Sequence, residues 1–203
     1  VEVWQKLIAV LDQGKGARTA ELTEDEAAIA NELQLLTGKP VLYCCNVLES
    51  DIHSGNAHVE AVRERAATEG AGVVMISGKI EAELSQLEPD EKAVFLEELG
   101  LKESGLDSVI RAAFKLLGLS TYFTAGVQEV RAWTFKTGSK APVCAGVIHS
   151  DFERGFIRAE TISWKDFETH GSQQACKEKG LMRSEGKEYV VQDGDILHFL
   201  FNV

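Results

Sequence analysis

Two short apolar runs, separated by a helical stretch, constrain the fold of this 203-residue chain more than any other feature. The runs are residues 41–45 (VLYCC) and 73–77 (VVMIS). Continuous apolar runs of this length are typical of strands buried on both faces, as in a parallel sheet. A helix predicted over residues 57–69 lies between them. The pattern is therefore strand–helix–strand, and it predicts an α/β fold.

Two helices are predicted ahead of the first strand. Residues 1–11 carry apolar side chains at helical spacing. Thr23 and Glu26 form the sequence pattern of a capping box, and the second helix is expected to run from there to Leu36. Its apolar stripe is expected to comprise Ile29, Leu33 and Leu36. A loop with two glycines joins the two helices, so we predict a helical hairpin.

Three more helices are expected before residue 120. They cover about residues 80–87, residues 89–100 with Pro89 in the first turn, and a stretch that Asp107 caps and Gly118 ends. Beyond them the chain changes to short β-type runs broken by Gly, Asp, Ser and Pro. The predicted strands are 121–126, 129–135, 145–149, 156–162, 188–191 and 196–201. With one helix at about 172–179, this predicts a small mixed β domain that begins near Leu119.

The net charge of −11 is unevenly distributed along the chain. Residues 1–119 hold 11 basic and 21 acidic side chains, whereas residues 120–203 hold 10 and 11. An acidic chain disfavours non-specific nucleic-acid binding, so DNA is not an expected partner, but a local basic face can still form late in the chain. No apolar run approaches the roughly 20 residues that cross a bilayer, so no membrane partner is expected.

The cysteines and histidines do not form a recognisable metal or catalytic pattern. Cys44 and Cys45 are neighbours in a predicted strand and point to opposite faces. We expect all four cysteines to be free buried thiols in the reducing cytoplasm. His53 and His58 are five residues apart, not the four that place two ligands on one helix face. The run 149–151 (HSD) is interpreted as a turn.

Polar residues follow both predicted strands of the parallel sheet. Asn46 and Glu49 come after the first strand, and Ser77 and Gly78 come at the end of the second. Ligands of open parallel sheets bind beyond the carboxyl ends of the strands, where these residues are expected to meet. An Asn amide can donate and accept at a purine edge, whereas an ionised Glu only accepts. Alone, Asn-x-x-Glu is a weak signal, because it is more often the turn at a helix start.

The order of the two elements resembles the way in which P-loop GTPases bind their base. Those proteins have Asn-Lys-x-Asp after one strand and Ser-Ala-Lys after the next. Here Val47 replaces the Lys and Glu49 replaces the Asp. The GTPase Asp accepts hydrogen bonds from N1–H and the exocyclic amine of guanine, whereas adenine has no N1–H and presents its amine at C6. The two replacements weaken the case for guanine and admit adenine.

Four longer stretches carry a more specific resemblance. They are residues 39–49, 105–135, 149–162 and 185–203. Through them the chain resembles the carboxyl-terminal part of the YchF/Obg-like ATPases, which belong to the Obg group of P-loop NTPases. The resemblance implies the carboxyl-terminal part of a P-loop NTPase parallel sheet, with a helical hairpin before it and a small β-grasp-like TGS domain after it. The implied domains are residues 1–36, 37–119 and 120–203.

The resemblance also implies a function. The family hydrolyses ATP in preference to GTP and associates with the ribosome in the cytoplasm. Carried over to this chain, it makes Asn46, Val47, Glu49, Ser77 and Gly78 the residues that bind adenine. It names ATP and Mg²⁺ as ligands and the ribosome as partner.

Basic and aromatic residues of the last domain are candidates for contact with ribosomal RNA. The basic residues are Arg131, Lys136, Lys140, Arg154, Arg158 and Lys165. The aromatic residues are Trp133, Phe135, Phe152, Phe156 and Trp164. In strands such aromatics are more often core residues, and the basic residues are equally consistent with an ordinary solvated face.

The sequence contains no G-x-x-x-x-G-K-[ST] phosphate loop. We therefore expect the phosphate loop, the Mg²⁺ ligands and the catalytic residues to precede Val1. The parent protein is expected to be an ATPase, and the 203 residues alone are expected to have no catalytic residue, no metal site and no activity. The alternative is a non-catalytic module that binds RNA or a small ligand.

Overall fold

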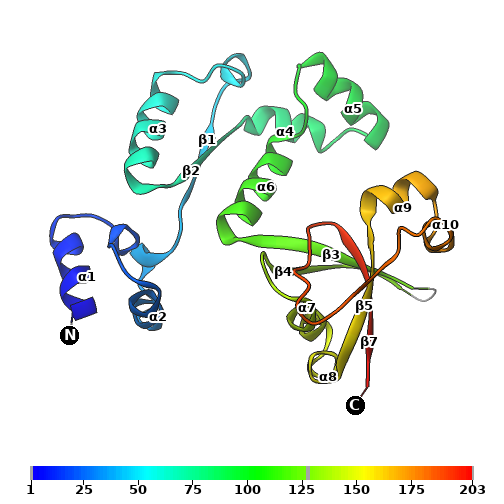
Figure 1. The fold of residues 1–203 in the computed structure, drawn as a ribbon. Helices are drawn as coiled ribbons and strands as arrows, with labels where there is room; N and C mark the ends of the chain where they lie inside the picture. The colour runs from blue at the N-terminus through cyan, green and yellow to red at the C-terminus, as the bar shows by residue number, and fades with distance from the viewer. Residues whose placement is uncertain (1, 127–128, 203) are drawn as a thin grey trace. The chain divides into compact units, whose positions relative to one another are not determined.

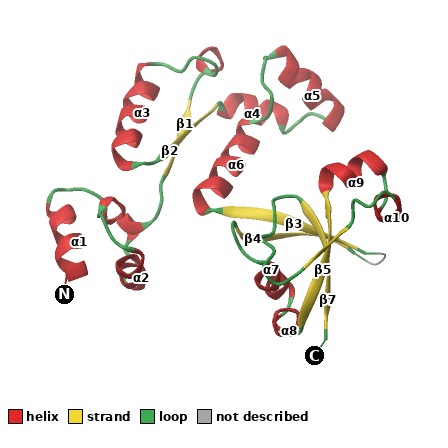
Figure 2. Cartoon of the chain, in the orientation of Figure 1, coloured by secondary structure: helices red, strands yellow, loops and turns green. Residues whose placement is uncertain are grey.

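The structure is a computed structural model that describes residues 2–126 and 129–202. Val1, Val127, Gln128 and Val203, which belong to the predicted hairpin and TGS domains, lie outside the described residues. The chain divides into two compact units, residues 1–117 (unit 1) and residues 118–203 (unit 2). Figures 1 and 2 show the helices and strands of each unit. No helix in the described part of the chain is long and apolar enough to span a membrane.

Unit 1 begins with the two predicted helices, α1 (Glu2–Asp12) and α2 (Glu24–Glu32). A short 3₁₀ helix (Ala17–Thr19) lies in the loop between them, and another (Leu36–Gly38) follows α2. The helices share a small core that contains Val3, Leu7 and Ala17. At the start of α2, the Thr23 hydroxyl accepts the Glu26 N–H and the Glu26 carboxylate accepts the Thr23 N–H, which confirms the capping box.

The predicted end of α2 and its apolar stripe are wrong. The helix ends at Glu32, because Gln34 adopts a left-handed conformation with φ of 51° that an α-helix cannot continue through. Leu36 then falls in the separate 3₁₀ helix and is 82% exposed, and Ile29 is 44% exposed. Of the predicted stripe, only Leu33 packs against the small core.

The central part of unit 1 is a strand–helix–strand element. Strand β1 (Leu42–Asn46) is followed by helix α3 (Ala57–Glu69) and strand β2 (Gly72–Ile76). The strands are parallel, with Leu42 beside Gly72 and Asn46 beside Ile76, as the sequence predicts. Helix α3 begins after the side-chain cap of Asn56 and ends at Gly70, which has a φ of 65°.

The prediction that these strands are buried on both faces is wrong for β1. The sheet has two strands, and in β1 Cys44 is exposed while Cys45 is half-buried. Helices α3 and α6 both pack against the sheet, but each of its two strands is an edge strand, so part of β1 stays exposed. The prediction of buried thiols is confirmed for Cys144 and Cys176, and all four cysteines are free.

Three helices complete unit 1: α4 (Gly78–Leu84), α5 (Pro89–Glu98) and α6 (Gly105–Leu117). The prediction that Asp107 caps α6 is wrong, because the helix begins at Gly105. The Ser104 hydroxyl instead accepts the N–H of Asp107 at 3.0 Å. The Glu81 carboxylate of α4 accepts the N–H of Gly105 at 2.7 Å, which binds the start of α6 to α4.

Unit 2 contains a five-stranded sheet with the strand order β4-β3-β7-β5-β6. The strands are β3 (Leu119–Ala125), β4 (Val130–Lys136), β5 (Phe156–Ser163), β6 (Arg183–Glu185) and β7 (Asp195–Phe201). Strand β3 runs parallel to β7, and the other neighbours are antiparallel. The helices are α7 (Ala141–Ile148), α8 (Ser150–Arg154), α9 (Trp164–His170) and α10 (Gln173–Glu178).

Two of the strands predicted for unit 2 are wrong. The run 145–149 belongs mostly to helix α7, and 188–191 makes only one isolated bridge, between Lys140 and Val190. A short apolar run does not distinguish a buried helix from a buried strand by its pattern. Pro142 lies in the first turn of α7, where proline is tolerated. The three-residue strand β6 and helices α8 and α9 were not predicted. The interpretation of residues 149–151 as a turn is wrong, because His149 caps α8 and Ser150 and Asp151 are its first residues.

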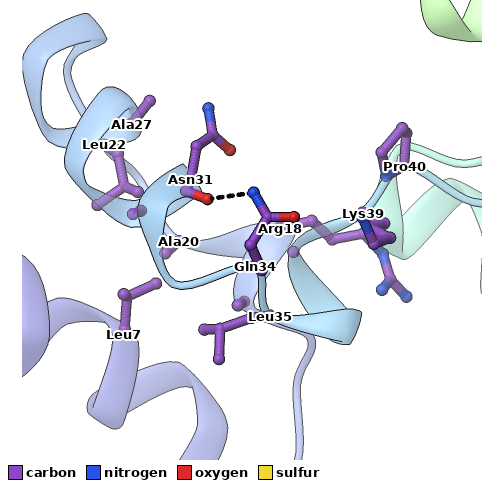
Figure 3. Close-up of a pocket in the computed structure, with 13 residues that line it drawn as sticks. Leu7, Arg18, Ala20, Leu22, Ala27, Asn31, Gln34, Leu35, Lys39 and Pro40 are labelled. Atoms are coloured by element: carbon purple, nitrogen blue, oxygen red, sulfur yellow. Dashed lines mark hydrogen bonds between the residues drawn. The ribbon is translucent and has the colours of Figure 1, made fainter.

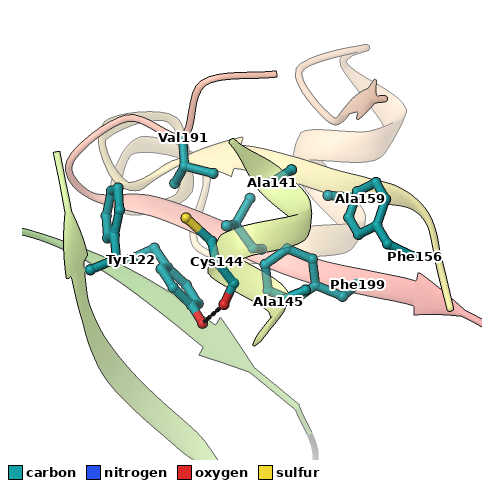
Figure 4. Packing of buried hydrophobic residues seen from close by; sticks show 10 residues of the cluster. Tyr122, Ala141, Cys144, Ala145, Phe156, Ala159, Val191 and Phe199 are labelled. Carbon is teal, nitrogen blue, oxygen red and sulfur yellow. Dashed lines mark hydrogen bonds between the residues drawn. The ribbon is translucent and has the colours of Figure 1, made fainter. Parts of the chain in front are cut away.

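The core of unit 2 lies between the sheet and α7 (Figure 4). Its aromatic members are Tyr122, Phe135, Phe156 and Phe199, and α7 contributes Ala141, Cys144 and Ala145. The Tyr122 hydroxyl donates to the Cys144 carbonyl oxygen at 2.8 Å. Trp133 and Phe152 also pack against this core. Most of the aromatic residues proposed for RNA contact are therefore core residues, whereas Trp164 is 44% exposed.

A buried carboxylate organises the loop before β7. Asp195 is 3% exposed. It accepts the Tyr189 hydroxyl at 2.7 Å and the Gln192 N–H at 2.9 Å. The Arg183 guanidinium lies 3.7 Å from its other oxygen. The buried carboxylate of Asp195 in β7 thus connects β6 with the loop before β7.

We predict that Asp195→Ala lowers the free energy of unfolding of unit 2 by about 3 kcal/mol, because it leaves the part-buried Tyr189 hydroxyl and Gln192 N–H and the Arg183 guanidinium without their acceptor. Tyr189→Phe removes one hydrogen bond and should cost only about 1 kcal/mol. Urea unfolding followed by tryptophan fluorescence measures both. Equal losses for the two variants would contradict the central role of Asp195.

Unit 2 should also lose stability in alkaline solution. Burial raises the pKa of the Cys144 thiol to about 12, and burial followed by the hydrogen bond to Asp195 raises that of Tyr189 to about 12. Both groups ionise more readily in the unfolded chain, so their stabilising contribution is complete below about pH 8.5 and is lost as the pH rises toward 12. Thermal unfolding between pH 7 and pH 11 measures the slope. Cys144→Ala should make this slope shallower, and an unchanged slope would contradict the assignment to Cys144.

Candidate functional site

The candidate site lies where β1 and β2 end at the same edge of the sheet. Asn46, the last residue of β1, is paired with Ile76, the last residue of β2. The next residue continues this contact, because the Val47 N–H donates to the Ile76 carbonyl oxygen at 2.8 Å. The two loops that carry the predicted site residues therefore leave the sheet side by side.

A direct hydrogen bond joins the two loops. The side-chain oxygen of Asn46 accepts the N–H of Gly78 at 2.9 Å. This bond orients the Asn46 amide, so that its NH₂ group is available to donate to a ligand. It also occupies the N–H of Gly78, one of the residues that the resemblance assigns to adenine binding.

Glu49 forms an ion pair with Lys79 in the first turn of α4. One Glu49 oxygen lies 3.2 Å from the Lys79 ammonium, which is also 3.8 Å from a Glu83 oxygen. The hydrogen bond that Lys79 donates to Glu49 is the main cause that raises the pKa of Lys79 above its usual range. The side chains of Glu49 and Lys79 are 47% and 69% exposed, so both remain accessible to a ligand.

Ser77 differs from the other predicted site residues because it is buried. It is 2% exposed, and its hydroxyl has no hydrogen-bond partner among the described residues. It precedes α4 but makes no side-chain cap. The Ser77 hydroxyl is therefore not exposed to a ligand in this structure.

Val47 and Asn46 line one end of a cavity of about 290 Å³ between β1 and α3. The other lining residues are Tyr43, Cys44, Cys45, Asn56, His58, Val59 and Val62. Glu49, Ser77 and Gly78 do not line it. An apolar residue at position 47 thus borders an apolar hollow, which suits contact with the flat face of a base better than a charged group would.

The loop after β1 is held at two further points. The Asn56 side chain donates to Asp51 at 2.8 Å. The His53 ring lies 2.8 Å from the Leu99 carbonyl oxygen at the end of α5. These contacts fix the 3₁₀ helix Glu49–Asp51 against α3 and α5, so Glu49 stands on a supported turn.

The contacts of Lys79 and Glu81 were not predicted from the sequence. Lys79 is 30 residues from Glu49, and Glu81 is 24 residues from Gly105. For Lys79 a signal was available, since a basic residue directly follows the second loop and faces the acidic residue of the first. For Glu81 no local pattern indicates that its partner is the start of a later helix.

A second cavity, of about 480 Å³, lies in the helical part of unit 1 (Figure 3). Its wall is mostly alanine and leucine side chains of α1, α2 and the loops around them, and Arg18 lies at its edge. The Arg18 guanidinium donates to the Thr37 carbonyl oxygen and to Glu69 of α3. Its charge thus ties the helical part to α3 rather than facing a ligand.

The basic residues of unit 2 mostly have acidic neighbours. Arg154 pairs with Asp151, Lys140 with Glu188, and Arg158 lies 3.8 Å from Glu160. Arg131 lies 3.8 Å from Glu129, and its guanidinium also stacks on the Trp133 ring at 4.1 Å. Within residues 2–126 and 129–202, no group of three or more His, Cys, Asp or Glu side chains is placed to hold a metal ion.

The comparisons with known proteins agree with each other. Residues 119–202 match the family model YchF-GTPase_C, described as a protein of unknown function (DUF933). The ribosome-binding ATPase YchF of Bacillus subtilis is 56% identical over 204 residues, which are all of this chain and 56% of that protein. The protein of the same name from Escherichia coli O157:H7 is 50% identical and is covered to 55%.

Solved structures give the same result. The YchF GTPase of Schizosaccharomyces pombe matches with a TM-score of 0.84 and 32% identity, over 98% of this chain and 53% of that chain. A GTP-binding protein from Pyrococcus horikoshii, at 17% identity and a TM-score of 0.57, shares the fold. The chain spans about half the length of the curated relatives it matches. Homology over its whole length places this chain in the YchF family.

Proposed function

We propose that this chain is the base-binding and carboxyl-terminal part of a P-loop ATPase that acts on the ribosome in the cytoplasm. Relatives with the name ribosome-binding ATPase support this reading, and they cover the chain from end to end. The observation that carries it is the hydrogen bond between Asn46 and Gly78. That bond brings together two loops 32 residues apart, each of which carries residues suited to a purine.

We propose adenine as the base. Its edge presents an amine at C6 and acceptors at N1 and N7. The free NH₂ of Asn46 suits N7, and Asn pairs with the N6 and N7 atoms of adenine in other complexes. Glu49 offers acceptors to the amine. Val47 borders the apolar hollow, where the ring is to lie. Ser77 and Gly78 shape the second side of the site.

ATP hydrolysis needs a phosphate cradle and Mg²⁺ in addition to a base site. We place both, with the catalytic residues, in the part of the protein that corresponds to the rest of the longer relatives. In this proposal residues 37–117 determine which base the protein binds. The 203 residues alone then bind nucleotide weakly and do not hydrolyse it.

We further propose that unit 2 is a TGS domain that contacts the ribosome. Arg131 and Trp133 support contact with RNA, since a guanidinium stacked on an indole offers both charge and a flat surface. Arg131 is 54% exposed on the edge strand β4, so a partner can reach it.

The double substitution Val47→Lys with Glu49→Asp tests the base site in a full-length protein that carries these residues. It restores the GTPase pattern, so the ratio of the GTP and ATP dissociation constants should shift toward GTP by about tenfold or more. Isothermal titration with both nucleotides measures the ratio. Lys102→Met, at an exposed lysine between α5 and α6, is the control and should leave it unchanged.

An unchanged ratio in the double variant, with ATP still bound, would contradict the assignment of positions 47 and 49. A wild-type full-length protein that binds no adenine nucleotide would contradict the proposed function itself.

Ribosome co-sedimentation tests unit 2. Arg131→Ala should weaken binding of the full-length protein to ribosomes several-fold at moderate salt, because it removes an exposed charge that stacks on Trp133 and lies 3.8 Å from its acidic neighbour, Glu129. Arg154→Ala is the matched control, since Arg154 already pairs with Asp151. Equal behaviour of the two variants and the wild type would contradict a role for Arg131, and retained binding after removal of residues 118–203 would exclude unit 2 as the contact.

A further inference from the structure

The ion pair between Glu49 and Lys79 bears on how the site distinguishes its base. Glu49 belongs to the 3₁₀ helix after β1 and Lys79 to the first turn of α4, and their charged atoms are 3.2 Å apart. The Asn46–Gly78 hydrogen bond joins the same two segments. A carboxylate only accepts hydrogen bonds and an ammonium only donates them. Side by side they form an acceptor–donor pair at the edge of the candidate base site.

The adenine edge has the opposite order of groups. The amine at C6 donates, and the neighbouring N1 accepts. In guanine the order is reversed, because O6 accepts and N1–H donates. If Asn46 binds N7, an adenine can form hydrogen bonds with both side chains in only one arrangement. The Glu49 carboxylate then lies opposite position 6 of the base, and the Lys79 ammonium lies opposite position 1.

We propose that Lys79 is a specificity-determining residue that donates a hydrogen bond to N1 of adenine, while Glu49 accepts from the C6 amine. This inference rests on the proposed adenine site. In that arrangement Lys79 and Glu49 disfavour guanine together, since the ammonium faces N1–H and the carboxylate faces O6.

The surroundings of the pair fit this role. Lys79 is 69% exposed and has three donors, so it can keep one contact to Glu49 while it turns another toward a base. Glu83, 3.8 Å away on the same helix, holds the ammonium on the side of α4 without closing it off. The turn that carries Glu49 is supported by the contacts of Asn56 and His53. The Glu49 acceptor is therefore held in place, whereas the Lys79 donor can change its direction.

The test compares ATP with 1-deaza-ATP, which lacks the N1 acceptor, in a full-length protein that carries these residues. The wild type should bind ATP at least about tenfold more tightly than 1-deaza-ATP, as expected for the loss of a charge-assisted hydrogen bond. In Lys79→Met this preference should fall to near unity. Lys79→Arg, which keeps a donor, should restore part of it.

Two controls separate the role of Lys79 from a general loss of structure. 7-Deaza-ATP, which lacks the atom assigned to Asn46, should be disfavoured to the same extent in the wild type and in Lys79→Met. Glu83→Gln removes the other carboxylate near Lys79 and should leave the preference for N1 intact. Thermal unfolding of each variant shows whether it folds as the wild type does.

These outcomes separate a failure of the proposed role of Lys79 from a failure of the proposed adenine site. If ATP binds and Lys79→Met retains the full preference over 1-deaza-ATP, the role of Lys79 is wrong while the adenine site stands. The same holds if the wild type does not distinguish the two nucleotides. If the wild type does not bind ATP, the proposed function fails and the role of Lys79 with it.

Discussion

The register in which β1 pairs with β2 determines the candidate site. Asn46 lies beside Ile76, so the loop after β1 and the loop after β2 begin at the same level of the sheet. A shift of one residue would turn every side chain of β1 to the other face. Asn46 would then no longer reach the Gly78 N–H at 2.9 Å. The contact between the loops is thus a consequence of parallel strand pairing, which the apolar patterns of the two strands specify.

Acidic side chains hold the elements around this sheet. Glu69 at the end of α3 accepts from Arg18 and from the Tyr43 hydroxyl, and it connects the helical part of unit 1 to α3 and β1. The hydrogen bond from Arg18 is the main cause that lowers the pKa of Glu69. Glu81 plays a similar part between α4 and α6, where it accepts from Gly105. These carboxylates connect the helices to their neighbours. A buried ion pair such as Arg18–Glu69 adds little net stability, because the loss of hydration offsets the attraction of the charges.

The parts of the fold that sequence predicts are those with local signals at both ends. Helix α3 has Asn56 before it and Gly70 after it, and its bounds agree with the prediction. The parts that fail depend on distant partners. The start of α6 is set by Ser104 together with Glu81 of another helix, and α7 is apolar on so many sides that its pattern resembles a strand. For the site, parallel pairing predicts that the two loops meet, but not that Lys79 selects Glu49 among many acidic residues, because that choice depends on three-dimensional distance.

The exposure of the Glu49–Lys79 pair separates ligand preference from folding. Glu69 is only 7% exposed and its partner Arg18 is 19% exposed. Removing either side chain therefore leaves the other charge largely shielded from water and without its partner. Glu49 and Lys79 are both largely solvated, and ion pairs of that kind contribute little to stability. Substitutions at these two positions therefore act on what the site binds while unit 1 stays folded. We therefore expect small changes in these two exposed side chains to change the base that the proposed site binds, while the buried contacts of Glu69 and the register of β1 keep the loops in place.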